Sequence, residues 1–358
     1  MSSKRPVVAV IGCGRIAQGA HFPAFAKLGN VRVKYACDLI IEKAQKMKEM
    51  YSFVENVIVD YKEALADPEV DTVYVLTPNY GHYEIGMAAL KAGKNVFCEK
   101  PITVNYEKSV EMANEAKKQG KLLNIGVCNR ANEGVRQLAK LVKEGKLGNV
   151  YHVYCAYRKF RCIPGLGGPF TTKELSGGGV LIDWGVHFFD LILYILGGAK
   201  VKTATCDTYS EMAKDMKKYK FSSMHAIETS DVEHGTNDVE DFVTGYIRTD
   251  KASISFNGAW AQNIDIDEMY IDFLGDRGGA RLSYTHNFVL WTTDEDGNVQ
   301  KVEKIFNIPD MYMVEDGEFL DAVMTGEKND QYVDEILESA RLLQLLYDSA
   351  KIKKEIDA

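Results

Sequence analysis

The sequence feature that most constrains the fold is a glycine turn directly after a short apolar strand. Residues 7–11 (VVAVI) are β-forming or small apolar residues, and residues 12–17 (GCGRIA) follow them with the pattern G-x-G-x-x-A. In a parallel α/β sheet the first glycine permits a tight turn, the second lets a pyrophosphate approach the backbone, and the next helix N-terminus attracts the phosphates. The alternative is a turn that ends a strand for structural reasons alone, so its context has to decide.

That context is an alternation of strands and helices over the first third of the chain. Short apolar runs predict strands, and segments with helical period separate them. The expected strands are 7–11, 31–37, 71–76, 95–98 and 122–126, and the expected helices lie near 15–28, 41–50, 60–66, 80–92 and 104–119. This alternation is typical of a doubly wound parallel sheet, so we expect an NAD-binding Rossmann domain over residues 1–126.

Asp38 ends the second expected strand, 38 − 17 = 21 residues beyond the glycine turn. A carboxylate at this position accepts hydrogen bonds from the ribose hydroxyls of a dinucleotide and repels a 2′-phosphate. The next residues, Leu39, Ile40 and Ile41, supply no cation. The sequence therefore predicts NAD as the cofactor rather than NADP.

The rest of the chain has a different pattern and predicts a second domain over residues 127–358. A helix near 133–144 precedes a strand over 150–157 and a long helix from about 172 to 196. Closely spaced β-rich runs at 240–248, 252–260, 268–274 and 279–283 indicate an antiparallel meander, and helices near 315–325 and 332–350 end the chain. The predicted fold class is α/β: a Rossmann sheet followed by an α+β domain with a largely antiparallel open sheet. The last helix is free to pack back on the first domain.

The composition limits the partners and the compartment. Hydrophobic residues make up 46 % of the chain and the formal net charge is −8, so we expect a globular protein that does not bind nucleic acid. The seven cysteines include no C-x-x-C pair, which is typical of free thiols in a reducing compartment. The most apolar stretch, 180–197, contains three ionisable residues, and no signal peptide is evident. We expect a cytoplasmic protein that does not enter a membrane.

Two further strand ends are expected to face the dinucleotide crevice, because ligands bind beyond the carboxyl ends of parallel strands. Residues 77–82 (TPNYGH) follow one strand and residues 99–101 (EKP) follow the next. The alternatives are helix capping for Thr77-Pro78-Asn79, a satisfied surface or capping histidine for His82, and a solvated surface lysine for Lys100.

Asp183 and His187 form a second group of chemically active residues. They are four residues apart, so an α-helix would place them on one face, and Asp190 follows three residues later. The alternative is a buried helix with a hydrogen-bonded His–Asp pair. We expect no metal, since no second cluster of ligands accompanies the pair.

With the glycine turn, the Glu99-Lys100-Pro101 tripeptide, the 177–190 segment and residues 275–280 (GDRGGA) in this order, the chain resembles the glucose–fructose oxidoreductase/inositol dehydrogenase/rhizopine catabolism (Gfo/Idh/MocA) family. The resemblance covers essentially the whole chain. It implies a nicotinamide cofactor, a C-terminal sheet that mediates a homo-oligomer, and Lys100, Asp183 and His187 as the catalytic trio.

The predicted sites combine the motifs and the resemblance. The expected cofactor contacts are Gly12, Gly14, Arg15, Ile16, Asp38, Thr77, Pro78, Asn79, His82, Glu99, Lys100 and Asn129, and the expected substrate contacts are Lys100, Tyr157, Arg158, Arg161, Asp183, Trp184 and His187. Oxidation of a secondary alcohol needs a base for the hydroxyl proton, which His187 or Lys100 can supply, with Asp183 orienting the imidazole or binding a neighbouring hydroxyl.

The loop before the catalytic segment bears on the substrate. Its pattern R-x-x-R-x-I-P-G from Arg158 resembles that of the subgroup that oxidises the C3 hydroxyl of glucosides, although Pro169 departs from the pattern where an aromatic loop is expected. The alternative is that Arg158 and Arg161 form ion pairs on the protein surface. Two other functions stay open at this point: an inositol dehydrogenase and a non-catalytic NAD-binding regulator.

Overall fold

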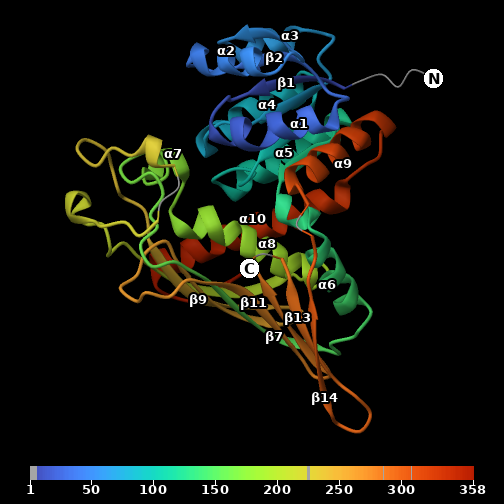
Figure 1. Ribbon diagram of the computed structural model, residues 1–358, viewed down its shortest axis with the longest axis vertical. Helices are drawn as coiled ribbons and strands as arrows, with labels where there is room; N and C mark the ends of the chain where they lie inside the picture. The colour runs from blue at the N-terminus through green and yellow to red at the C-terminus, as the bar shows by residue number, and fades with distance from the viewer. Residues whose placement is uncertain (1–5, 224–225, 285, 308) are drawn as a thin grey trace. The chain divides into compact units, whose positions relative to one another are not determined.

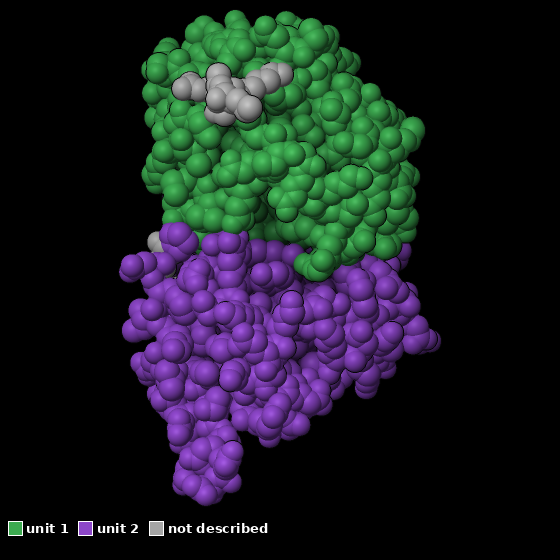
Figure 2. All heavy atoms as spheres, turned by 90° about the vertical axis from the view of Figure 1, so that its right-hand side faces the viewer, with its two compact units in different colours: residues 1–128, 310–337 green, residues 129–309, 338–358 purple. Residues whose placement is uncertain are grey.

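The computed structural model describes residues 6–223, 226–284, 286–307 and 309–358, and the chain folds into two compact units. The first unit takes in residues 1–128 and 310–337, and the second takes in residues 129–309 and 338–358. Figure 2 shows the two sets of residues in different colours.

The first unit is built on a six-stranded parallel sheet with the order β3-β2-β1-β4-β5-β6 (Figure 1), which confirms the Rossmann prediction. Its strands are β1 (Val7–Ile11), β2 (Arg32–Cys37), β3 (Val54–Ile58), β4 (Thr72–Val75), β5 (Asn95–Glu99) and β6 (Leu123–Gly126). Its helices are η1 (Ala17–His21), α1 (Phe22–Leu28), α2 (Ile41–Met50), α3 (Tyr61–Ala66), η2 (Asn79–Gly81), α4 (His82–Lys91), α5 (Tyr106–Gln119) and α9 (Met311–Thr325).

Strand β3 was missing from the sequence prediction. It lies at the edge of the sheet, and Glu55 and Asn56 in its centre are both exposed, so it lacks the apolar run of a central strand. Helix α9 is the other addition. Its Phe319 and Leu320 are buried in the same cluster as Tyr74 and Phe97, which makes a segment from late in the chain part of the Rossmann core.

The second unit contains a nine-stranded sheet with the order β14-β13-β12-β11-β7-β10-β9-β8-β15. Neighbouring strands are antiparallel except for the parallel pair β7 and β10. Its strands are β7 (Val150–Arg158), β8 (Val201–Tyr209), β9 (Phe242–Thr249), β10 (Ser253–Ala259), β11 (Glu268–Gly275), β12 (Gly278–Ser283), β13 (Phe288–Thr293), β14 (Val299–Lys304) and β15 (Ile356–Asp357). Its helices are η3 (Cys128–Ala131, whose first residue belongs to the first unit), α6 (Glu133–Lys143), α7 (Lys173–Ser176), η4 (Leu181–Gly185), α8 (Val186–Ile195), η5 (Met216–Lys218), η6 (Ile227–Thr229) and the C-terminal part of α10 (Asp330–Ile352).

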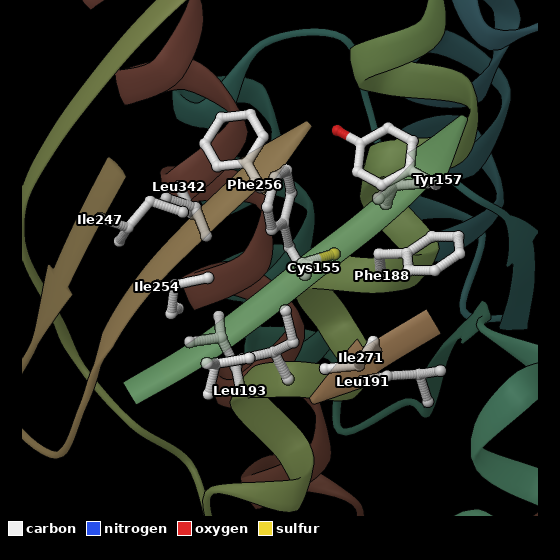
Figure 3. Close-up of a cluster of buried hydrophobic side chains, with 14 of the residues drawn as sticks. Cys155, Tyr157, Phe188, Leu191, Leu193, Ile247, Ile254, Phe256, Ile271 and Leu342 are labelled. Atoms are coloured by element: carbon white, nitrogen blue, oxygen red, sulfur yellow. The ribbon is translucent and has the colours of Figure 1, made fainter. Parts of the chain in front are cut away.

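The core of this unit lies between one face of the sheet and the helices α8 and α10. Figure 3 shows Tyr157 of β7, Phe256 of β10, Phe188 of α8 and Leu342 of α10 in this cluster, and all four side chains are buried. Strand β14 was not predicted because every one of its residues is exposed and it has no apolar face.

The long helix expected from 172 to 196 is wrong, because the chain breaks at Gly177. Gly177 has φ +84°, which ends α7, and the helix that resumes at 180 begins with the π-helical turn η4. The next two glycines permit close packing: a Cβ on Gly178 would lie 2.0 Å from the Tyr347 hydroxyl oxygen, and one on Gly179 would lie 1.9 Å from the Glu240 carbonyl oxygen. Among the described residues, only the Lys173–Ile195 stretch is long and apolar enough to cross a membrane, and 78 % of its most apolar window is buried inside the protein.

Candidate active site

The glycine turn at the end of β1 has the geometry that a dinucleotide needs. Gly12 has φ +97°, and a Cβ on it would lie 2.6 Å from the Leu76 carbonyl oxygen, so no other residue fits without displacing the backbone. A Cβ built on Gly14 would meet nothing within 4 Å, which leaves open space beside the backbone. The turn runs into the helical segment η1–α1, and the N-terminus of a helix attracts phosphate groups.

Asp38 is fixed beside this turn. Its Oδ2 accepts a hydrogen bond of 2.8 Å from the Cys13 amide, and its Oδ1 accepts one of 2.9 Å from the Ile40 amide. Leu39 and Ile40 next to it are 81 % and 52 % exposed, so the surface beside the carboxylate is aliphatic rather than cationic. This arrangement fits a ribose without a 2′-phosphate, as the sequence predicted.

The two strand-end loops predicted to line the cofactor are joined by His82. This histidine is fully buried, with Nδ1 2.7 Å from the Pro101 carbonyl oxygen and Nε2 2.9 Å from the Thr77 carbonyl oxygen. Burial lowers the pKa of its imidazole. His82 therefore holds the two loops together from a buried position, neither at the surface nor as a cap, and its contact with the cofactor stays a prediction. The buried Thr77 hydroxyl oxygen has no hydrogen-bond partner among the described residues, which suits a ligand atom there.

Glu99 ends β5 and is buried, and both of its carboxylate oxygens have partners in the first unit. Oε2 accepts a hydrogen bond of 3.0 Å from the Lys100 amide, and Oε1 lies 3.1 Å from His21 Nε2. Glu99 was expected to touch the cofactor. In the structure its buried carboxylate contacts His21 and the Lys100 amide. The half-buried Lys100 follows, with its backbone held by that carboxylate.

The second group of predicted residues lies in the second unit, on the helix that resumes at 180. Asp183 is in η4 and its Oδ2 accepts a hydrogen bond of 3.2 Å from the indole Nε1 of Trp260. His187 is in the first turn of α8, and its Nδ1 lies 3.2 Å from Asn129 Nδ2. Asn129, which was expected to touch the cofactor, is a hydrogen-bond partner of His187, the predicted catalytic histidine.

Sequence reasoning missed the role of Trp260. It follows β10 and is 1 % exposed, as a core residue is. Only the structure shows that its indole N–H is directed at Asp183.

Asp190 is part of a buried ion pair rather than of the chemistry. Arg130 donates from Nε to Asp190 Oδ2 at 2.8 Å and from Nη2 to Oδ1 at 2.7 Å, and Ser339 donates to Oδ1 at 3.2 Å. The side chains of Arg130 and Asp190 are 9 % and 2 % exposed. Since Arg130 directly follows Asn129, the pair fixes that asparagine next to α8.

Glu240 fixes the beginning of the same helix. Its Oε1 accepts hydrogen bonds from the amides of Gly179 and Leu181, at 2.9 and 3.1 Å, and from the Tyr347 hydroxyl at 2.8 Å. Burial raises the pKa of this carboxyl, and the three donors act in the opposite direction. An acceptor at a helix N-terminus satisfies amides that the helix leaves unpaired, so Glu240 holds the turn that contains Asp183.

Two of the predicted substrate contacts, Tyr157 and Arg158, are consecutive residues of β7, so their side chains lie on opposite faces of the sheet. Tyr157 is fully buried and stacks on Phe188, with ring centroids 4.9 Å apart, so its ring packs in the core instead of facing a ligand. Arg158, the next residue, points to the other face of the sheet and forms an ion pair with Glu268, which is the alternative considered from the sequence. Arg161 donates to Asn263.

Trp184 is half-buried and packs against the core of the second unit. Substrate contacts of Arg161 and Trp184 stay predictions. Among the described residues, no group of three or more His, Cys, Asp or Glu side chains is placed to hold a metal ion.

Two family models match the chain. A model described as an oxidoreductase family with an NAD-binding Rossmann fold matches residues 7–127, and the model of the GFO/IDH/MocA C-terminal domain matches residues 135–281. The two matches together span most of both units.

Relatives and solved structures agree with these matches. D-glucoside 3-dehydrogenase of Escherichia coli K12 is 33 % identical over 84 % of this chain and 82 % of its own length. Myo-inositol 2-dehydrogenase of Thermotoga maritima is 32 % identical over 53 % of this chain and 54 % of its own length. The structure of a levoglucosan dehydrogenase in complex with NADH and levoglucosan superposes with a TM-score of 0.83 over 99 % of both chains, at 20 % identity, which shows a shared fold.

Proposed function

This chain belongs to the Gfo/Idh/MocA family of NAD-binding oxidoreductases, and from that premise we propose that it oxidises the C3 hydroxyl of a glucoside to a ketone. The coarser function, an NAD-dependent oxidoreductase of sugar or polyol hydroxyls, follows from the family and its relatives. The observation that carries the finer proposal is the 33 % identity to the E. coli D-glucoside 3-dehydrogenase over 84 % of the chain.

The glycine turn and Asp38 are the residues that would hold NAD. The turn leaves space beside Gly14 for a pyrophosphate, and Asp38 supplies acceptors for the ribose hydroxyls. When bound, the nicotinamide supplies the acceptor for the hydride that leaves the sugar carbon. The protein has to position the sugar and take up the hydroxyl proton.

The contact between Asn129 and His187 bears on which residue takes that proton. An amide N–H donated to Nδ1 leaves the proton of the neutral imidazole on Nε2. His187 then presents an N–H to the substrate oxygen and stabilises the developing alkoxide, whereas the Lys100 amine takes the hydroxyl proton. The carbon loses its hydride, the oxygen loses its proton, and a ketone forms.

The proposal is tested with purified protein, NAD and a panel of glucosides, free sugars and inositols, followed by nicotinamide absorbance. We expect turnover of a glucoside and a primary isotope effect with C3-deuterated substrate. Lys100→Ala and His187→Asn should each lower turnover by about two orders of magnitude or more, with NAD affinity nearly unchanged. Exclusive turnover of inositols, with every glucoside unchanged, would refute the C3 proposal.

An inositol dehydrogenase is the second candidate, because the Thermotoga maritima relative is nearly as similar to this chain, although over a shorter part of it. The same panel separates the two substrates.

We also propose a cytoplasmic homo-oligomer formed through the open face of the nine-stranded sheet. Tyr151 and Tyr154 lie on β7 and are 52 % and 49 % exposed, which is unusual for aromatic residues in the middle of a sheet. Sedimentation of the protein against a Tyr151→Lys/Tyr154→Lys variant measures the assembly.

A further inference from the structure

Three ionisable side chains in the first unit, those of Asp316, His21 and Glu99, form a buried row that ends at the Lys100 amide. His21 from η1 lies between Asp316 of α9 and Glu99 at the end of β5. Its Nδ1 is 3.0 Å from Asp316 Oδ1 and 3.1 Å from Oδ2, and its Nε2 is 3.1 Å from Glu99 Oε1. The side chains of His21 and Asp316 are fully buried. His21 and Asp316 are 295 residues apart in the sequence, so only the fold brings them together.

The geometry favours His21 as an imidazolium. Both ring nitrogens face carboxylates, which only accept hydrogen bonds, so both nitrogens donate. Burial alone would lower the pKa of this histidine, but Asp316 and Glu99 more than offset that and raise the pKa to about 10. Burial also raises the pKa of the Asp316 carboxyl, and the adjacent imidazolium opposes that rise.

The other titratable groups that face this row come from β4, the first residue of η3 and α9. Burial raises the pKa values of Tyr74, Tyr312, Cys128 and Glu315. The row itself consists of the His21 imidazole between two carboxyl groups, and Lys100 follows Glu99 in the chain.

The row is also held rigidly. The rings of Tyr74, Phe97 and Tyr312 meet the imidazole edge-on, with centroids 5.7, 5.2 and 5.5 Å away. On the other side, a Cβ on Gly126 would lie 2.8 Å from Glu99 Oε1, so β6 packs directly against that carboxylate. Glu99 thus has little room to rotate, and its Oε2 reaches the Lys100 amide at 3.0 Å.

We propose that His21, held by Asp316, is a positioning residue for Lys100: it fixes the Glu99 carboxylate on the Lys100 amide and thereby fixes the backbone from which the lysine side chain starts. This inference rests on the proposed function, in which Lys100 takes the hydroxyl proton. A segment from late in the chain, α9, then contributes to the chemistry without touching the substrate.

The test compares two neighbouring acids on α9. Asp316→Asn removes the carboxylate that His21 Nδ1 contacts, whereas Glu315→Gln changes the adjacent buried carboxyl, which is not one of the His21 hydrogen-bond partners given above. His21→Gln is the direct variant. For His21→Gln and Asp316→Asn we expect kcat to fall tenfold or more, with the Kd for NAD changed less than twofold. Glu315→Gln should keep wild-type kcat, and circular dichroism and NAD binding confirm that each variant is folded.

A pH profile distinguishes positioning from mere stability. Without the His21 charge the Glu99 carboxylate is uncompensated, which favours the protonated amine of Lys100, so the acid limb of kcat should move to higher pH in His21→Gln. A merely structural role lowers the amount of active protein without moving that limb. Wild-type kcat and an unmoved limb in a folded His21→Gln variant would overturn the inference.

Imidazole ¹⁵N NMR of the wild-type protein measures the row without any substrate. We expect one histidine to remain an imidazolium to about pH 9, with its signal absent in His21→Gln. A neutral His21 at pH 8 would refute the inference even in an active enzyme. If the signal is present and the protein oxidises no sugar or polyol, the proposed function has failed, the positioning role falls with it, and the ion-paired row is left as a structural feature.

Discussion

Breaking the Arg130–Asp190 pair should destabilise the second unit strongly. Arg130→Met keeps most of the aliphatic bulk but removes both guanidinium hydrogen bonds, at 2.8 and 2.7 Å, from a carboxylate that is 2 % exposed. Only the Ser339 hydroxyl then remains as a hydrogen-bond donor to Asp190 among the contacts described above. A buried ion that loses its partner costs about 3–5 kcal/mol, so we expect a decrease of that size in the free energy of unfolding.

Tryptophan fluorescence is the natural assay, since all three tryptophans, at 184, 260 and 291, belong to the second unit. Urea unfolding followed by this signal gives the free energy of that unit. The control is Lys159→Met, which breaks an ion pair with Asp267 whose side chains are 29 % and 51 % exposed and should cost at most about 1 kcal/mol.

A double variant completes the cycle. Arg130→Met/Asp190→Leu removes both charges, so no ion is left buried and unpaired. This variant should recover most of the free energy of unfolding that Arg130→Met alone loses. If Arg130→Met costs no more than Lys159→Met, the pair is not buried in the folded protein and the reasoning fails.

Three further results are expected. Asp38→Ser with Leu39→Arg should narrow or reverse the preference for NAD over NADP in binding titrations, and tighter binding of NADP by the unaltered protein would contradict the cofactor assignment. Asn129→Asp should move the proton of neutral His187 from Nε2 to Nδ1, because a carboxylate only accepts; imidazole ¹⁵N shifts report this, and unchanged shifts would contradict the assigned donor. The stabilising effect of His21 should be fully present below pH 6.5 and lost as the pH rises through about 10, since its pKa is raised in the folded state; thermal unfolding of His21→Gln should lack that decrease.

The sequence was sufficient for the features that local patterns determine. The glycine turn and Asp38 follow strands whose apolar runs are continuous, and the structure places them together at the ends of β1 and β2. The spacing of Asp183 and His187 also located the second group correctly on one helix, although the π-helical turn η4 and the break at Gly177 were not predicted.

What the sequence could not supply are the partners from distant segments. Trp260 is 77 residues from Asp183 in the sequence, and Glu240 is about 60 residues from the amides that donate to it. Nothing in the sequence around either residue marks it as a polar partner of this helix. Tyr157 shows a related limit: an aromatic residue near a ligand loop and an aromatic core residue look alike until the alternation of β7 is known, and the structure buries this ring in the core.

The helix from 180 to 195 joins these observations. Its buried face packs in the core through residues such as Phe188 and Phe189. Apolar packing is not directional, so it is insensitive to small rotations about the helix axis. Directional hydrogen bonds remove that freedom: Glu240 holds the first turn, Trp260 holds Asp183, and Arg130 holds Asp190 near the end. His187 lies between these fixed points, and its Nδ1 is 3.2 Å from Asn129 Nδ2. In the proposed reaction the imidazole has to present one nitrogen to the substrate, so a helix held at both ends positions that ring.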